Sequence, residues 1–294
     1  MGNWNGENAA LANMIFLVLH IVFMSSFGLQ IKYHQASGRD LLSVGAINYI
    51  VAAFVAGAWV IHKGEFGFSN ATWITGTMCG IAYVVSYFFL MSSVKSSGLS
   101  ITWSVVRLSV IIPVLFSIFY WKEQPNAYQI GGIVSVCVSL PLLSIKPDNG
   151  DGRKLIGRIS PVIIGLFFVT GSSGLAAKAF SEFSPPEQRQ MYLLFLFGTT
   201  AIISVFALLI RKRLPAPSNI PSGIMLGVCN LLAGYFLLLS LKRLPGMLVF
   251  PISGSIGIVL SSLAGVAIWR EKLRKFTVLG IIAAVIAVVL INLK

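Results

Sequence analysis

The sequence predicts an all-α integral membrane protein with ten transmembrane helices, built as two inverted five-helix repeats. Three observations support this prediction. Of the 294 residues, 56% are hydrophobic and 11% are charged, and the mean hydropathy is +0.86, whereas about a quarter of the residues in soluble domains are charged. The apolar residues gather in runs close to the length of about twenty residues that a helix needs to cross a bilayer. The two halves of the chain also resemble each other.

The apolar runs follow one another along the chain with short links between them. They cover residues 11–31, 41–62, 72–94, 99–121, 127–145, 157–178, 190–210, 220–241, 247–269 and 276–293. The longest polar stretch, KPDNGDGRKLIGR (146–158), lies at the midpoint and has the Gly, Pro and Asp content of a loop. We therefore expect one repeat at 1–146, a linker at 147–156 and a second repeat at 157–294. No basic stretch precedes the first run, so we expect a retained helix there and not a signal peptide.

The two halves align over short stretches at matching helix ends. A shift of 148 residues places YFFLMSSVKSSG (87–98) on YFLLLSLKRLPG (235–246), and a shift of 146 places SFGLQIK (26–32) on SSGLAAK (172–178). Because each repeat has an odd number of helices, the second copy must enter the membrane from the opposite face. An inverted repeat of this kind predicts a binding site between the halves, near the midplane.

Both halves contain a W-[KR]-E motif with a glycine nine residues after the glutamate, namely Glu123 with Gly132 and Glu271 with Gly280. Together with RLSVIIPVLFSIFYWKEQPNAYQIGG and FPISGSIGIVLSSLAGVAIWREKLRKFTVLG, this motif resembles the ten-helix, EamA-type members of the drug/metabolite transporter superfamily along the whole chain. The resemblance implies two inverted bundles around a central cavity and alternating access without ATP. It also implies a substrate among amino acids, nucleotide sugars, phosphorylated sugars, purines and drugs.

Arg107, within TWSVVRLSVIIP (102–113), is a permanent charge deep inside an apolar run. If its helix starts near Leu99, Arg107 lies about 12 Å into a core of ~30 Å, close to the midplane. An Arg at that depth costs about 2.5–3.5 kcal/mol on insertion scales, so it should face a cavity or a partner. All nine Asp and Glu residues lie in loops or at helix ends, and the equivalent position of the second half is Ser255.

Two hypotheses explain Arg107. Its guanidinium binds the carboxylate or phosphate of a substrate in bidentate fashion, or it bonds backbone carbonyls and Asn or Ser side chains and holds helices together.

Five further residues are candidates for the substrate site. Trp103 lies one turn before Arg107, where its ring can stack on the guanidinium or on a substrate. Tyr83 and Tyr87, four residues apart, offer hydroxyl groups and aromatic walls, with bundle packing as the alternative. Asn48 and Asn230 lie near mid-depth, where an amide needs a partner, and a hydrogen bond between helices is the alternative for them.

Coupling and gating candidates come from the remaining polar groups near the membrane. His20 lies nine residues into the first run, where it can carry a coupling proton or serve as a neutral packing group. Lys32 and Lys178 end the first helix of each half and either gate the two mouths of the cavity or extend to the interface. Glu123 and Glu271 precede the fifth and tenth helices, where a carboxylate favours the positive end of the helix dipole.

Several classes of function are excluded by motifs that the sequence lacks. It contains no P-loop, no HExxH and no pair of acids within the membrane, so we expect neither ATP hydrolysis by that route nor an intramembrane protease. Cys79, Cys137 and Cys229 have no metal-ligand spacing and are interpreted as packing residues. We expect no enzymatic activity, no cofactor and no metal.

We therefore expect a secondary transporter of small anionic or zwitterionic metabolites in the cell membrane, inner or plasma, acting as a monomer. Export of hydrophobic or cationic drugs by the same fold is an alternative, although a cation/proton antiporter would need a buried acid. A membrane scaffold or receptor-like subunit is a further alternative. The net charge of +13 is spread over helix flanks, which argues against nucleic acid as a partner. Facilitated diffusion, substrate exchange and His-linked proton coupling all fit, and the orientation of the termini is open.

Overall fold

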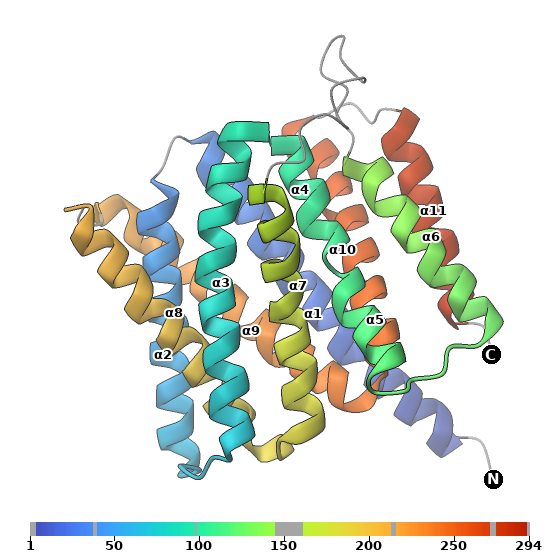
Figure 1. Cartoon of the computed structure of the whole chain (residues 1–294), viewed down its shortest axis with the longest axis horizontal. Helices are drawn as coiled ribbons and strands as arrows, with labels where there is room; N and C mark the ends of the chain where they lie inside the picture. The colour runs from blue at the N-terminus through green and yellow to red at the C-terminus, as the bar shows by residue number, and fades with distance from the viewer. Residues whose placement is uncertain are drawn as a thin grey trace. The chain divides into compact units, whose positions relative to one another are not determined.

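The computed structural model describes residues 4–37, 40–97, 99–144, 161–212, 216–270 and 275–292, and in these ranges the chain is helical with short connections (Figure 1). The helices are α1 (Trp4–Ala36), α2 (Leu41–Lys63), α3 (Asn70–Ser97), α4 (Leu99–Leu108), α5 (Ile111–Phe119), α6 (Ala127–Ser144), α7 (Pro161–Phe183), α8 (Arg189–Ile210), α9 (Ile220–Arg243), α10 (Gly246–Trp269) and α11 (Lys275–Asn292). Two short 3₁₀ helices, η3 (Pro186–Gln188) and η4 (Pro217–Asn219), precede α8 and α9.

The lengths and composition of these helices make the chain a multi-pass membrane protein. Seven of the described helical stretches are long and apolar enough to cross a membrane, and three shorter apolar helical stretches lie at Val105–Phe119, Ala127–Val136 and Val278–Ala287. Except for the run at 99–121, each predicted apolar run corresponds to one helix, and α1 extends beyond its run at both ends. The predicted linker at 147–156 lies outside the described residues.

The prediction of one helix over 99–121 is wrong, because this segment is broken between α4 and α5. Pro113 has no N–H to donate to the carbonyl of Ser109, and its ring would clash with that carbonyl in a regular helix. The chain tightens at this point, where Ile112 N donates to Ser109 O at 3.1 Å and Val110 N donates to Arg107 O at 3.4 Å. Arg107 therefore lies in the last turn before a break in the helix.

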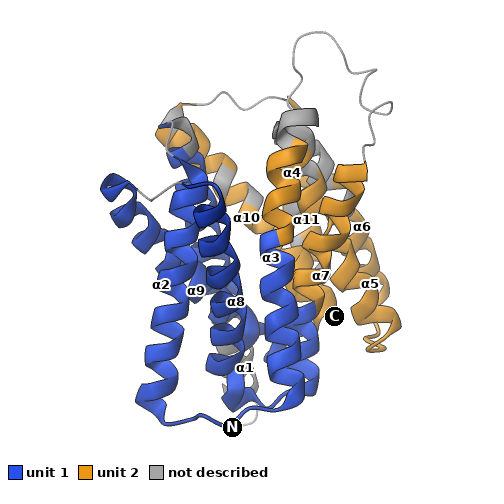
Figure 2. Cartoon of the chain, turned by 60° about the vertical axis from the view of Figure 1, so that its left-hand side comes forward, with its two compact units in different colours: residues 1–84, 176–244 blue, residues 85–175, 245–294 orange. Residues whose placement is uncertain are grey.

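The helices form two compact units, which Figure 2 shows in different colours. Unit 1 comprises residues 1–84 and 176–244, and unit 2 comprises residues 85–175 and 245–294. Each unit thus combines segments from both of the predicted repeats. The boundaries of the units fall inside α3 and α7, so each of these two helices contributes one part to each unit.

Unit 1 is held together by close approaches between helix backbones at glycine. In this unit α2 packs against α8 and α9, and α1 packs against α9. A Cβ atom at Gly227 of α9 would lie 2.6 Å from the carbonyl oxygen of Asn48, and one at Gly80 of α3 would lie 2.5 Å from that of Leu196. Since real Cβ atoms do not come so close to backbone oxygen, only glycine lets these helices pack at this distance.

Unit 2 is organised around α10, which packs against α5, α6 and α11, while α6 packs along α11. Glycines again allow close contact. A Cβ at Gly171 of α7 would lie 2.3 Å from Ile112, and one at Gly174 would lie 3.1 Å from Pro113 and 3.4 Å from Phe250. The N-terminal part of α7 is therefore pressed against α5 and α10, next to the break that precedes α5.

Large apolar side chains cover the outer faces of helices in both units. Phe54 of α2 is 75% exposed, Phe119 of α5 is 77% exposed and Ile210 of α8 is 78% exposed. An exposed apolar surface of this extent indicates that something apolar covers it. For a protein with this many apolar helices, the hydrocarbon chains of lipid cover this surface.

The glycine contacts of unit 1 give a first prediction. We expect Gly80→Ala to lower the free energy of unfolding by about 1–3 kcal/mol, because the added methyl group has to push apart the backbones of α3 and α8. Gly198→Ala on α8 is the matched control, since a Cβ there would meet no atom of the described residues within 4 Å. Thermal unfolding in detergent, followed by tryptophan fluorescence, measures both variants. Equal melting temperatures for Gly80→Ala and Gly198→Ala would contradict the packing described.

Candidate functional site

Arg107 is the central residue of the candidate site. It lies in the last turn of α4, in unit 2. Its Nη1 atom is buried and has no hydrogen-bond partner in the part of the chain that the structure describes, although the side chain as a whole is half-buried. A buried donor of a charged group that stays unsatisfied costs more than an ordinary hydrogen bond contributes. The Nη1 atom is therefore a position where a ligand oxygen would be stabilising.

Two buried serines of the same unit also lack hydrogen-bond partners among the described residues. The hydroxyls belong to Ser117 of α5 and Ser255 of α10, and both residues are 0% exposed. Elsewhere in unit 2 hydroxyl groups satisfy one another, because Ser93 and Thr102 lie 2.8 Å apart and Ser86 lies 2.6 Å from Thr170. Sequence reasoning identified Ser255 only as the counterpart of Arg107, since a serine in an apolar run does not reveal whether it is paired.

The three aromatic candidates do not form one described cluster. Tyr83 belongs to unit 1 and Tyr87 to unit 2, since the boundary between the units falls at residues 84 and 85 of α3. Tyr83 is half-buried, and the hydroxyl of Tyr87 is buried. Trp103 belongs to α4, but its side chain lies outside the described part of the structure. The predicted roles of all three in substrate binding stay predictions.

The structure brings Asn48 and Asn230 together. Asn230 Nδ2 of α9 donates to Asn48 Oδ1 of α2 at 3.2 Å, and both side chains are buried. This is the hydrogen bond between helices that we stated as the alternative to substrate binding. It fixes the register of α2 against α9 at the same level where Gly227 meets the backbone of Asn48.

His20 makes one described hydrogen bond, in which Nδ1 lies 2.8 Å from the carbonyl oxygen of Ala233 on α9. Because a carbonyl can only accept, the Nδ1 atom carries the proton. The side chain is buried between α1 and α9. This contact fits the packing role, and proton coupling by His20 stays a prediction.

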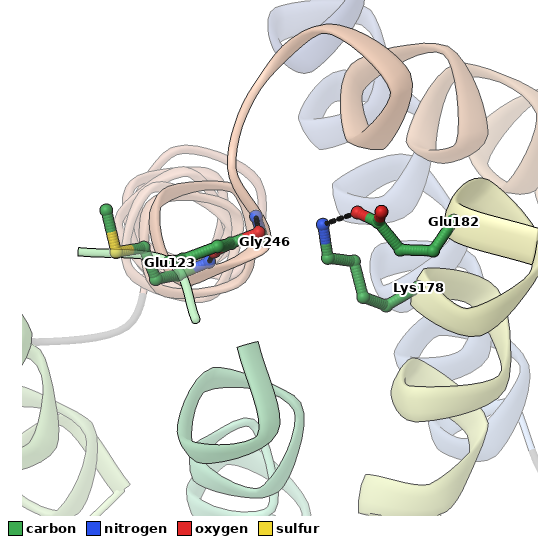
Figure 3. A network of polar contacts seen from close by, with 5 residues as sticks. Glu123, Lys178, Glu182 and Gly246 are labelled. Carbon is green, nitrogen blue, oxygen red and sulfur yellow. Dashed lines mark hydrogen bonds and ion pairs between the residues drawn. The ribbon is translucent and has the colours of Figure 1, made fainter. Parts of the chain in front are cut away.

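The two lysine candidates lie one turn before the ends of their helices, because α1 continues to Ala36 and α7 continues to Phe183. Lys32 is half-buried. Lys178 is only 2% exposed, and its Nζ donates to Glu182 Oε1 at 2.5 Å, as the dashed line in Figure 3 shows. Sequence reasoning missed this partner, although the spacing of four residues along a helix could have indicated it.

Glu123 binds backbone N–H groups at the start of a helix, but that helix is α10 and not α6, the helix that we predicted. Its Oε1 accepts from Gly246 N at 2.9 Å and its Oε2 accepts from Met247 N at 2.8 Å, so it caps α10 (Figure 3). At the start of α6 the backbone N–H groups are satisfied by a reciprocal pair of hydrogen bonds. Asn126 N donates to Gln129 Oε1, and Gln129 N donates to Asn126 Oδ1. Glu271 lies outside the described residues.

A metal site has no support in the described ranges, where no three His, Cys, Asp or Glu side chains gather as ligands. Arg107 combines a positive charge with a buried donor that has no partner among the described residues, and a group of this kind can bind an anion.

Helices that are long and apolar enough to cross a membrane many times, and that pack at glycines, define a multi-pass membrane protein. A model of the EamA-like transporter family matches residues 11–145 and again residues 159–293. The chain therefore belongs to the EamA-like transporter family, within the drug/metabolite transporter superfamily, and the predicted membership is confirmed.

The chain is also similar to two individual proteins. The chain is 24% identical over 287 residues to an uncharacterized protein of Haemophilus influenzae, covering 94% of this chain and 96% of the relative. A protein of solved crystal structure is 17% identical, with a TM-score of 0.74 and a coverage of 96% of each chain. At this level of identity the second comparison shows that the fold is shared.

The cap at α10 gives a second prediction. We expect Glu123→Ala to lower the free energy of unfolding by about 1–2 kcal/mol, because two N–H groups at the helix start lose their acceptor. Glu123→Gln should fall between this variant and the wild type, since one oxygen acceptor is kept. As a control, Glu65→Ala removes a carboxylate 3.9 Å from Lys63 at the surface, a contact worth about 0–1 kcal/mol. The cap would be refuted by melting temperatures of Glu123→Ala and Glu65→Ala that do not differ.

Proposed function

We propose that this protein is a secondary, ATP-independent transporter of small metabolites that carry a carboxylate or phosphate group. The solute binds near Arg107, and the protein works by alternating access of two inverted five-helix repeats, at 1–146 and 157–294. The observation that carries the proposal is the buried Nη1 atom of Arg107, which has no hydrogen-bond partner within the described ranges. Membership of a transporter family supports the general role.

The charge of Arg107 supports an anionic solute for an energetic reason. An Arg at membrane depth that served only to hold helices together would be expected to use its donors on carbonyls or side chains. Here one donor stays available, and the cost of keeping it buried falls when an anion enters and forms a charge-assisted hydrogen bond. A cationic solute would add repulsion at the same place.

The position of Arg107 supports a site that changes during transport. Discontinuous helices supply the substrate sites of many transporters, because a broken backbone offers polar groups at membrane depth. Arg107 lies directly before the break between α4 and α5. A small rotation of either segment about this point would move the guanidinium relative to the rest of unit 2.

The third prediction tests the proposed site by transport into proteoliposomes. The assay measures uptake of labelled amino acids, organic acids and sugar phosphates, without ATP. We expect Arg107→Gln to reduce uptake of the preferred solute at least about 10-fold, because a hydrogen bond to a charged group is worth about 1.5–3 kcal/mol. Arg107→Lys should retain part of the activity, since it keeps the charge but not the bidentate geometry.

A matched arginine variant separates a site effect from loss of charge in general. Arg243→Gln removes an exposed guanidinium at the end of α9, which lies 4.8 Å from the centre of the Phe16 ring, and it should transport like the wild type. The proposal fails if Arg107→Gln is folded and transports normally. It also fails if hydrophobic cations, and no anion or zwitterion, are transported by the wild type.

A further inference from the structure

We infer that the hydroxyl of Ser255 is a second donor of the solute site, and that Arg107 and Ser255 together select a monocarboxylate over a phosphate ester. This inference rests on the proposed function, because it assumes that Arg107 faces the solute. It goes beyond that function by naming a second binding residue on another helix and by restricting the substrate class. Both residues belong to unit 2.

The first step is the direction of α5, which follows the α4 segment that carries Arg107. Its direction relative to α10, which carries Ser255, can be derived from the cap at Glu123. Glu123 follows α5 and binds the first N–H groups of α10 at Gly246 and Met247. The end of α5 therefore meets the start of α10, and the two helices pack side by side. They must run antiparallel, as Figure 1 also shows.

The second step is the height of the two side chains. Gly174 of α7 is the common reference, since a Cβ there would contact both Pro113 and Phe250. Arg107 lies six residues before Pro113, which is about 9–12 Å along the axis because the tightened turn has a larger rise per residue than a regular α-helix, and Ser255 lies five residues after Phe250, which is about 7.5 Å. Because α5 and α10 are antiparallel, both displacements point the same way. Arg107 and Ser255 therefore lie within about one helical turn of each other in height, beside the α4–α5 break of unit 2.

The third step is that both groups are available at this level. The Oγ atom of Ser255 and the Nη1 atom of Arg107 are buried without hydrogen-bond partners among the residues that the structure describes. A Cβ at the neighbouring Gly254 would meet no described atom within 4 Å, although Gly254 itself is half-buried. The face of α10 next to Ser255 is thus open, and an oxygen bound to both groups would satisfy two buried donors together.

The fourth step is the charge that the site provides. Among the described side chains of unit 2 the other cations, Lys122, Arg270 and Lys275, lie at or outside helix ends. One guanidinium and one neutral hydroxyl balance a single negative charge, with planar geometry matched to two carboxylate oxygens. A phosphate ester carries up to two negative charges near pH 7, and one of these would stay without a counter-ion at this depth. The site therefore fits a monocarboxylate.

The test compares two serine variants of equal burial in the same unit. Ser255→Ala removes the inferred donor, and Ser117→Ala removes an equally buried hydroxyl near the other end of α5. The probes are acetate, lactate and pyruvate as monocarboxylates, with inorganic phosphate and glycerol phosphate as the competing class. Binding is followed by ligand-dependent thermal stabilisation and by uptake into proteoliposomes.

We expect at least one monocarboxylate to stabilise the wild type, with neither phosphate compound doing so. Ser255→Ala should weaken the apparent affinity for that probe about 5- to 10-fold, as expected for one hydrogen bond to a charged group, and Ser117→Ala should bind like the wild type. Should Ser255→Ala not fold, Gly254→Val provides the same test, because its side chain fills the space beside Ser255 and should abolish binding.

The outcomes separate this inference from the proposed function. Equal affinities of Ser255→Ala and Ser117→Ala, or binding of a phosphate compound in preference to the monocarboxylates, would overturn the role of Ser255 and the substrate class while leaving Arg107 as the anion site. Monocarboxylate binding that survives Arg107→Gln unchanged would overturn both the inference and the proposed function. Normal binding by a folded Gly254→Val variant would place the ligand elsewhere and overturn the inference alone.

Discussion

A polypeptide inside hydrocarbon finds no water for its backbone N–H and C=O groups, and this requirement governs the rest of the structure. Helices satisfy it along nearly the whole described chain. Pro113 has no N–H group to donate to the helical hydrogen-bond ladder, and the segment at that point is divided into α4 and α5. Pro251 lies inside α10, which stays continuous. Of the two corresponding segments, the one that carries Arg107 is thus interrupted and the other is continuous.

Association of the helices depends on how closely their backbones approach, because lipid tails are as apolar as the side chains that they contact. Gly80 and Gly227 permit such approaches in unit 1, and Gly171 permits one in unit 2. Polar contacts such as that between Asn48 and Asn230 then fix the register. Since these contacts join segments from different halves of the sequence, each compact unit is built from both halves.

A charge and a broken helix are both costly in a membrane segment, and here they are adjacent. The counterpart of Arg107 in the other half is Ser255, which is neutral and lies in a continuous helix. The duplicated scaffold therefore differs between its halves at this level. This asymmetry agrees with the proposed function, in which one position of a duplicated framework is specialised to bind a solute.

The sequence by itself determined the class of protein and nearly every helix, because hydropathy depends on composition over about twenty residues and needs no knowledge of neighbours. It also showed that the apolar run that carries Arg107 contains no acidic residue. The break at Pro113 could have been predicted from the residue alone. Only the tertiary structure decided that Glu123 caps α10 and that Ser255 is buried without a partner within the described ranges. These facts depend on which helices meet and at what height, and many pairings of apolar helices are compatible with the same pattern of hydropathy.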